Sequence, residues 1–210
     1  RVRLGSLEPR TITPEFCRRA AALPNLCPHF HLSMQSGCDS VLARMNRKYD
    51  SERYYESVRL LNEAYETPGI TTDLIVGFPG ETEEEFQQTL AFIRRCAFSA
   101  MHIFPYSRRP GTPADGMPGQ ILNSVKEERA HRAQQAALEM EAAYLDRWVG
   151  RTVPVLFEEE RDGLWRGHTT RYSEVAAPSG ENLHNQLRQV YITGRAGNIL
   201  QGELCEGQEK

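Results

Sequence analysis

The sequence predicts an α/β protein in which a parallel sheet or barrel is followed by a small antiparallel β-barrel. Up to residue 148, short apolar runs of strand length alternate with helical patterns. Such an alternation requires parallel strands with helices packed outside them. After residue 150 the pattern changes to short strands separated by Gly, Pro, Asn and Ser at intervals of about ten residues, which is typical of a small antiparallel barrel.

The first part of the chain contains apolar runs of strand length, at residues 1–8, 29–35, 70–78 and 99–106. Between and after these runs, apolar residues recur with helical spacing, which predicts helices near residues 14–23, 39–46, 51–66, 83–95 and 124–148. The resulting order of strand and helix is that of a parallel (βα) architecture.

Residues that can cap a helix mark several of the predicted starts. Thr13 precedes a proline at the first helical position, and Thr82 with Glu85 forms a capping box. Ser124 with Glu127 is expected to form a second capping box at the start of the long helix. These signals predict where the helices begin.

The second part of the chain is expected to form its own barrel. Its strands lie within residues 151–159, 163–169, 172–178, 186–194 and 198–205. A boundary near residues 147–150 therefore divides the chain into a first domain, residues 1–148, and a second domain, residues 149–207.

Composition excludes several classes of protein. The chain has 25 Lys and Arg against 28 Asp and Glu, so its net charge of -3 gives no global argument for nucleic acid or a membrane surface. No apolar run approaches the roughly 18 residues that span a bilayer, and a cytoplasmic protein is expected. The 5 cysteines are an odd number without a CxxC pair, which argues against a disulfide framework and predicts no metal ligands in this chain.

Polar side chains recur on one face of the predicted parallel strands. Successive residues of a strand point to opposite faces, which places on a single side His31 with Gln35, Asp73 with Gly77, and His102 with Tyr106. A barrel lumen lined in this way requires a ligand, water or internal pairing.

A ligand site is expected at the carboxyl ends of the strands, where parallel architectures place their sites. These ends read GSLEP, QSG, GFPGE and YSRR, with glycines for close backbone approach and polar groups for hydrogen bonds. No GxxxxGK or GxGxxG is present, so a wall for a flat ligand is favoured over a phosphate cradle.

Four motifs in order, RLGSLEP, HLSMQSGCDSVLARMNRKY, DLIVGFPGETEEEF and FPYSRRPGTPA, resemble the radical S-adenosylmethionine (SAM) methylthiotransferases. Their spelling is most similar to the branch that acts on threonylcarbamoyladenosine at position 37 of tRNA. GRTVPVLFEE and GHTTRYSEV resemble the TRAM domain, a small OB-like RNA-binding barrel that ends these enzymes. The resemblance implies the last four strands of a partial radical SAM barrel followed by TRAM.

The resemblance also implies a function. Members of the family methylthiolate carbon 2 of N6-threonylcarbamoyladenosine beside the anticodon, using SAM and two 4Fe-4S clusters. The cysteines that hold these clusters in the family are absent from this sequence, so the chain is expected to be a carboxyl-terminal fragment, inactive alone, with no catalytic residue of its own. The implied partners are the anticodon stem-loop of tRNA and a reductant such as flavodoxin or ferredoxin.

Site residues follow from the matching motifs. The residues implied to bind SAM are Ser6, Glu8, Gln35, Arg47, Gly77, Phe78 and Tyr106. Arg3, His31 and Asp73 are expected to meet the substrate base or the second cluster. The residues expected to bind the RNA are Arg166, Arg171, Tyr172 and Arg188.

Other functions remain open at this stage. The enzyme could instead act on isopentenyladenosine in tRNA or on a ribosomal protein, as other branches of the family do. A metal-dependent hydrolase would use His29, His31, His102 and Asp73 as ligands. A non-catalytic RNA-binding module would use the parallel part only as a scaffold.

Overall fold

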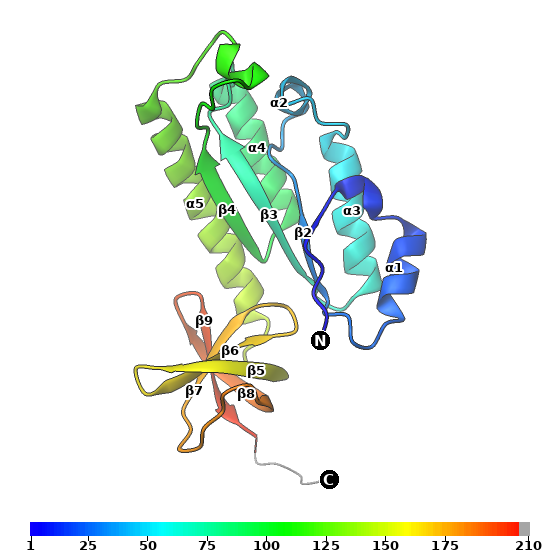
Figure 1. Cartoon of the computed structure of the whole chain (residues 1–210), viewed down its shortest axis with the longest axis vertical. Helices are drawn as coiled ribbons and strands as arrows, with labels where there is room; N and C mark the ends of the chain where they lie inside the picture. Colours follow the sequence, from blue (N-terminus) through cyan, green and yellow to red (C-terminus); the bar gives the residue numbers. More distant parts are fainter. Residues whose placement is uncertain (206–210) are drawn as a thin grey trace.

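The computed structural model describes residues 1–205 and contains a four-stranded parallel sheet and a separate closed barrel of five strands (Figure 1). Each part has its own hydrophobic core: one draws on residues from Ile12 to Ala136, the other on residues from Tyr144 to Leu200. The predicted parallel sheet and the separate barrel are confirmed. The division into domains at residue 148 stays a prediction, and residues 206 and 207 of the second lie outside the described residues.

The strands of the sheet stand in chain order and are all parallel. They are β1 (Ser6–Leu7), β2 (His29–Leu32), β3 (Gly69–Val76) and β4 (Ala100–Pro105). Ser6 pairs with His31, His31 with Thr71, and Thr71 with Ala100, so these residues share one level of the sheet. That level fixes which side chains of neighbouring strands can meet.

The helices connect the strands and cover one face of the sheet. They are α1 (Pro14–Ala21), α2 (Asp39–Arg44), α3 (Ser51–Ala64), α4 (Glu83–Cys96) and α5 (Asn123–Asp146), with 3-10 turns η1 (Pro9–Thr11) and η2 (Pro113–Gly116). Along β3, Ile70, Thr72, Leu74 and Val76 are buried, whereas Thr71, Asp73 and Ile75 are only half-buried. The predicted difference between the two faces of this strand is therefore present. Within residues 1–205, none of the helices combines the length and apolarity needed to cross a membrane.

Two of the three predicted helix caps are confirmed. Thr13 accepts a hydrogen bond from the third residue of α1, and Thr82 with Glu85 forms both halves of a capping box at α4. The capping box predicted at Ser124 is wrong, because α5 begins at Asn123 and its N-cap is Leu122. Ser124 already has helical backbone there, so it cannot occupy the cap position.

The barrel contains β5 (Thr152–Arg161), β6 (Leu164–Thr169), β7 (Glu174–Ala177), β8 (Leu187–Ala196) and β9 (Ile199–Leu204), in the ring order β5-β6-β7-β9-β8. Neighbours are antiparallel except β7 and β9, which pair in parallel, so the prediction of a purely antiparallel barrel is wrong. The reason is parity: directions cannot alternate all the way around a closed ring with an odd number of strands.

The barrel lies beyond the C-terminal end of α5 and close to the N-terminus of the chain (Figure 1). Arg1 donates hydrogen bonds to the carbonyl oxygens of Pro154 and His168, at 3.1 and 3.3 Å. Tyr144 Oη, near the end of α5, donates to the carbonyl oxygen of Thr67 at 3.4 Å. These contacts place the barrel against the amino ends of the parallel strands, opposite the carboxyl ends where a ligand site was expected.

Candidate functional site

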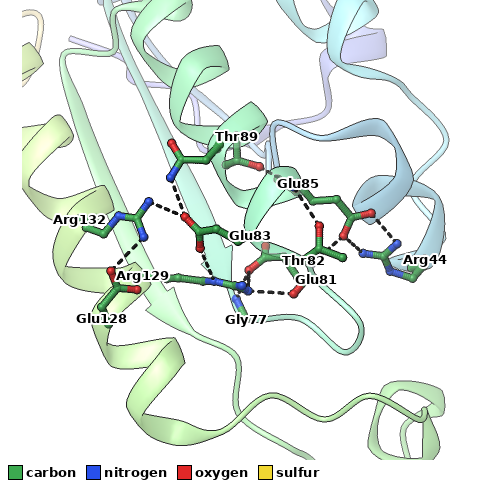
Figure 2. Close-up of polar contacts among 12 residues, drawn as sticks. Arg44, Gly77, Glu81, Thr82, Glu83, Glu85, Thr89, Glu128, Arg129 and Arg132 are labelled. Atoms are coloured by element: carbon green, nitrogen blue, oxygen red, sulfur yellow. Dashed lines mark hydrogen bonds and ion pairs between the residues drawn. The ribbon is translucent and has the colours of Figure 1, made fainter.

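The turn after β3 is held by a buried ion pair (Figure 2). Glu81 accepts a hydrogen bond from the backbone N–H of Gly77 at 2.7 Å and pairs with Arg129 of α5 at 2.8 Å. The two side chains are 1% and 6% exposed, and Arg129 also donates to the carbonyl oxygen of Glu81. Burial raises the pKa of Glu81, opposed by Gly77 and Arg129. The glycine-proline turn is thus fixed from inside, and Glu81 faces no ligand.

Gly77 and Tyr106 meet a buried lysine at this end of the sheet. Lys126 is 9% exposed and donates to the carbonyl oxygen of Tyr106 at 2.9 Å. A Cβ on Gly77, whose φ is +71°, would lie 2.2 Å from Cγ of Lys126, so only glycine fits. The ring of Phe78 packs edge-on against Tyr106 at 5.3 Å. Tyr106 Oη is buried and has no hydrogen-bond partner among residues 1–205.

The structure brings most of the other predicted cofactor residues to the same end. Gln35 continues β2 beside β3, since its N–H donates to Asp73 O and its carbonyl accepts from Ile75 N–H, both at 2.9 Å. Burial raises the pKa of Tyr49, which also responds to the charges of Arg47 and Glu8 nearby. Gln35, Arg47 and Glu8 therefore border one region at the carboxyl ends of β1 and β2.

Ser6 lies elsewhere. The register puts Ser6 level with Thr71, five residues before Val76 on β3. At about 3.3 Å per residue, this difference is roughly 17 Å along the strands. Ser6 instead borders a cavity at the amino ends of the strands, together with Arg3 and His31.

That cavity, the junction pocket, has a volume of about 440 Å³ and lies between the concave face of the sheet and the barrel. Its lining comes from β1 to β4 and the residues just before β1, from α5, from β6 and the loop after it, and from the turn between β8 and β9: Arg3, Ser6, His29, His31, Thr71, His102, Glu141, His168, Arg171, Tyr172 and Asn198. Two of the three residues predicted to meet the substrate base, Arg3 and His31, therefore lie in one pocket.

The third predicted residue, Asp73, connects to this pocket through His31. Nε2 of His31 lies 3.3 Å from Oδ2 of Asp73, and Nδ1 lies 3.0 Å from Oγ1 of Thr71. These bonds orient the imidazole on the concave face. His102 stands on the other side, with its ring centre 6.3 Å from that of His31.

The barrel contributes a stacked aromatic wall. The ring of Tyr172 stacks on that of His168 at 4.4 Å with an interplanar angle of 15°, and the guanidinium of Arg3 lies 3.4 Å from the centre of the same tyrosine ring. Two groups at these separations cannot share one face, so they cover opposite faces of Tyr172. Stacking of an RNA base on Tyr172 would require one of them to move.

Arg171 holds the barrel to the sheet. Its guanidinium donates to the carbonyl oxygens of Thr67 and Glu66, both at 2.8 Å, and lies 4.5 Å from the ring of Trp148. Burial lowers the pKa of Arg171. The structure thus gives Arg171 backbone partners at the junction, where its donors are engaged without any phosphate.

The remaining arginines predicted to grip RNA have acidic neighbours. Arg166 lies 3.5 Å from Glu174, and Arg188 pairs with Glu181 at 2.7 Å. Phosphate binding by either arginine would have to compete with its carboxylate. The barrel face that they occupy is therefore less basic than the arginine count in the sequence indicates.

His29 was considered in the sequence only as a metal ligand, and its position in the junction pocket was missed. It is 4% exposed, and Nδ1 has no hydrogen-bond partner within residues 1–205. Burial, with the nearby charges of Arg3 and His31, lowers the pKa of His29 to about 4. Since a lone histidine at a strand start carries no local signal, only the register could reveal this position.

The ligand set of a metal-dependent hydrolase is not assembled. Over residues 1–205, no group of three or more His, Cys, Asp or Glu side chains could hold a metal ion. Cys17, Cys27, Cys38 and Cys96 are buried free thiols, and burial raises the pKa of Cys96 to about 12. The described residues therefore do not fit an iron-sulfur cluster.

The sequence of this chain is similar to those of known enzymes. Residues 5–93 match the radical SAM superfamily. The chain is 36% identical, over 98% of its length and 49% of the relative, to the threonylcarbamoyladenosine tRNA methylthiotransferase of Bacillus subtilis. It is 42% identical to the tRNA-2-methylthio-N(6)-dimethylallyladenosine synthase of Mycobacteroides abscessus, over 95% of this chain and 39% of that protein. The chain thus spans half or less of the length of these relatives.

A solved structure has a similar fold. The coproporphyrinogen III oxidase of Escherichia coli, a radical SAM enzyme, superposes with a TM-score of 0.54 and 20% identity over 65% of this chain and 32% of its own. At this identity the likeness concerns the fold alone. The four-stranded parallel sheet with helices on one face accordingly fits part of a radical SAM barrel.

Proposed function

Because this chain belongs to the radical SAM methylthiotransferase family, we propose that it is part of an enzyme that methylthiolates an adenosine of tRNA. The similarity to tRNA-modifying relatives over almost the whole chain carries this proposal. The matching region joins a parallel sheet to a closed barrel, so the relationship concerns both parts together. We further propose that the enzyme works in the cytoplasm, where it finds tRNA.

The proposed substrate is N6-threonylcarbamoyladenosine beside the anticodon, modified at carbon 2. The GSLEP and HLSMQSGCD motifs and the Bacillus subtilis relative support this choice. Dimethylallyladenosine is the second candidate, because relatives named for that nucleoside reach 43% identity. Both candidates are adenosines that carry a substituent at N6.

The carboxyl ends of the strands fit SAM. Lys126 fills the space that a Cβ on Gly77 would take, so Gly77 can offer only its backbone, whereas the buried hydroxyl of Tyr106, which has no partner among residues 1–205, offers a hydrogen bond to a bound molecule. Arg47 can pair with a carboxylate, and Gln35, Glu8 and the backbone around Phe78 border the same region. SAM supplies the methyl group and the radical chemistry of the family when it is bound; these residues would bind it, orient it and exclude water.

The iron-sulfur clusters, unlike SAM, have no binding residues among those that the structure describes. The family uses two 4Fe-4S clusters, and residues 1–205 contain no set of ligands for either. We propose that the ligands lie in a part of the enzyme outside this sequence and that this chain alone is inactive. A reductant such as flavodoxin or ferredoxin would serve the complete enzyme.

We propose that residues 149–207 form a TRAM domain that binds the anticodon stem-loop, and that residues 1–148 form the last four strands of the radical SAM barrel. The closed five-stranded ring and the GHTTRY motif, which covers the end of β6 and the loop after it, support the first assignment. Arg166 and Arg188 are the candidates to grip phosphate, in exchange for their acidic neighbours.

The test is complementation. The complete reading frame that encodes this chain is expressed in a bacterium that lacks its own tRNA methylthiotransferases, and the nucleosides of its tRNA are separated by chromatography and identified by mass. We expect the methylthio derivative of threonylcarbamoyladenosine. The dimethylallyl derivative would support the second candidate, whereas neither derivative, from a protein that is expressed and folded, would contradict the proposed function.

A further inference from the structure

We propose that the junction pocket binds one unpaired nucleobase, at a site separate from the carboxyl-end site where SAM is proposed to bind. The proposal rests on the proposed function for the source of that base, a single-stranded segment of RNA.

The shape and the walls of the pocket suit a planar ring. A volume of about 440 Å³ lies within the usual range of small-molecule sites, and such sites often form where two cores meet. Five aromatic rings border it, those of His29, His31, His102, His168 and Tyr172. Both faces of Tyr172 are already covered by His168 and Arg3, so a base would stack on the histidines of the sheet, because every base has a π-face.

The polar groups of the pocket suit the edge of a base. Nδ1 of His29 has no partner within residues 1–205, and a buried nitrogen in that state is costly. Rotation about the terminal torsion of histidine is soft, so the ring can turn this nitrogen toward a ligand. Ser6 and Asn198 add a hydroxyl and an amide at the border of the pocket. Together these groups can donate to and accept from a heterocycle.

The charges of the pocket favour a neutral ligand over a phosphate. Arg171 is bound to backbone carbonyls and His168 lies 2.9 Å from Glu158, so both are engaged already. Arg3 is stacked on Tyr172, and His29 is neutral near pH 7 because its pKa is lowered to about 4. A phosphate dianion would therefore find few cationic side chains free to pair with it. A neutral base needs no such ion pair, so the pocket favours a base.

The floor of the pocket is rigid. Tyr172 has a φ of +64°, a conformation that is strained for a tyrosine and persists only when its surroundings enforce it. The neighbouring residue, Arg171, fixes this part of the backbone through its two hydrogen bonds to the loop before β3. Gly69, the first residue of β3, leaves no space, since a Cβ there would lie 2.6 Å from the carbonyl oxygen of Arg171. The stacked wall is therefore preorganised before any ligand arrives.

The position of the pocket sets which base it could take. The pocket lies level with Thr71, six residues and roughly 20 Å along the strands from the turn at Gly77. A base in the pocket is thus a different nucleotide from the adenosine that reacts near SAM. Two separate binding sites for bases of one RNA loop would fix the orientation of that loop, which neither site could do alone.

The experiment uses the 210-residue chain and an anticodon stem-loop in which 2-aminopurine replaces each unpaired base in turn. We expect the fluorescence of one position, other than the modified adenosine, to change on binding. His29→Phe keeps an aromatic ring but removes Nδ1, so it should lower the affinity by roughly 2- to 10-fold, the worth of one hydrogen bond, and Asn198→Ala should lower it as well. His131→Phe, at an exposed histidine of α5, is the matched control and should leave binding unchanged.

Free adenosine, cytidine and inorganic phosphate are titrated separately, with binding followed by ligand-observed NMR. Nucleoside binding that depends on His29, with no phosphate binding, supports the pocket even if the stem-loop fails to bind, in which case the proposed function fails alone. Stem-loop binding that is unchanged in both pocket variants overturns the pocket and leaves the proposed function intact. Phosphate binding with the same dependence on His29, or no binding of nucleoside or RNA, also overturns it. Circular dichroism establishes that each variant is folded.

Discussion

Replacing Arg129 by Met should produce a stability defect with a defined dependence on pH. In the wild type, Glu81 and Arg129 are almost completely buried, 2.8 Å apart. Removing the guanidinium leaves a carboxylate with one remaining donor, the N–H of Gly77. Removing one partner of such a pair typically costs about 3–5 kcal/mol.

Protonation of Glu81 limits this cost. Neutralising a carboxyl with an unfolded pKa of about 4.3 costs roughly 3.7 kcal/mol at pH 7, because each pH unit is worth about 1.36 kcal/mol. The folded-state pKa, already raised by burial, rises further in the variant. A raised folded pKa gives stability that is present below the unfolded pKa and is lost as pH increases. The defect should therefore be about 3–4 kcal/mol at pH 7 and about 1 kcal/mol at pH 5.

The assay is urea unfolding followed by circular dichroism at 222 nm, which reports the helices. Trp148 and Trp165 both lie in the barrel core, so tryptophan fluorescence reports the barrel separately. With a slope of about 2 kcal/mol/M, the helical midpoint at pH 7 should fall by roughly 1.5–2 M. Arg132→Met, at a partly exposed neighbour that pairs with Glu83 and Glu128, is the control and should cost less than about 1 kcal/mol.

The reasoning would be refuted by a defect of the same size at pH 5 and pH 7, or by one as small as that of the control. The double variant Glu81→Gln/Arg129→Met adds a second check. It has no carboxyl at position 81, so its own stability should lack the loss between pH 5 and pH 7 that Glu81 causes in the single variant.

Three further predictions follow from contacts at the same end of the sheet and from the cysteines. Arg44, with Ser40 and a backbone N–H, lowers the pKa of Glu85 to about 2 despite partial burial. The stability of the wild type should therefore fall by roughly 1–2 kcal/mol as pH decreases from about 4.5 to 2. Arg44→Ala should remove that fall, as measured by thermal melts over a pH series. Gly77→Ala should destabilise much more than Gly80→Ala, because both glycines have φ above +70° but only the first would place a Cβ in collision, at 2.2 Å; equal urea midpoints would contradict this. Reconstitution with iron and sulfide should give no stoichiometric 4Fe-4S absorption, since the buried thiol of Cys96, with a pKa of about 12, is a poor ligand; a stoichiometric cluster would show that the thiols assemble.

Local patterns predicted most of the elements of this fold. Strand and helix periodicity and the caps at Thr13 and Thr82 depend on neighbouring residues, so the sequence contains them directly. The capping box predicted at Ser124 is wrong because α5 begins at Asn123, one residue before that serine. A local pattern does not fix the end of a helix to a single residue. The number of strands alone predicts that a closed five-stranded ring contains a parallel pair of neighbours, but not that β7 and β9 form it.

The candidate site was less predictable, because its residues are paired across long stretches of chain. The alternation of faces along β2 and along β3 predicted polar sides that carry His31 and Asp73, and the structure joins these two side chains. The level of Ser6 depends on the register between strands, which loop lengths do not reveal. Arg129 bonds to a residue 48 positions away, and Arg171 to one 104 positions away; neither pair has a local signal.

The parallel pairing of β7 and β9 determines how the barrel closes. The pairs β5–β6, β6–β7 and β8–β9 are neighbours in sequence, and each can form over a short connection. The β7–β9 ladder aligns only Val175 with Leu200 and Ala176 with Gln201, whereas the other closure, β5–β8, runs from Thr152 to Leu156. The barrel is therefore equivalent to a curved sheet whose two edges join along its shortest ladder, so transient opening there would expose β7 and β9 as free edges while every hairpin stays intact.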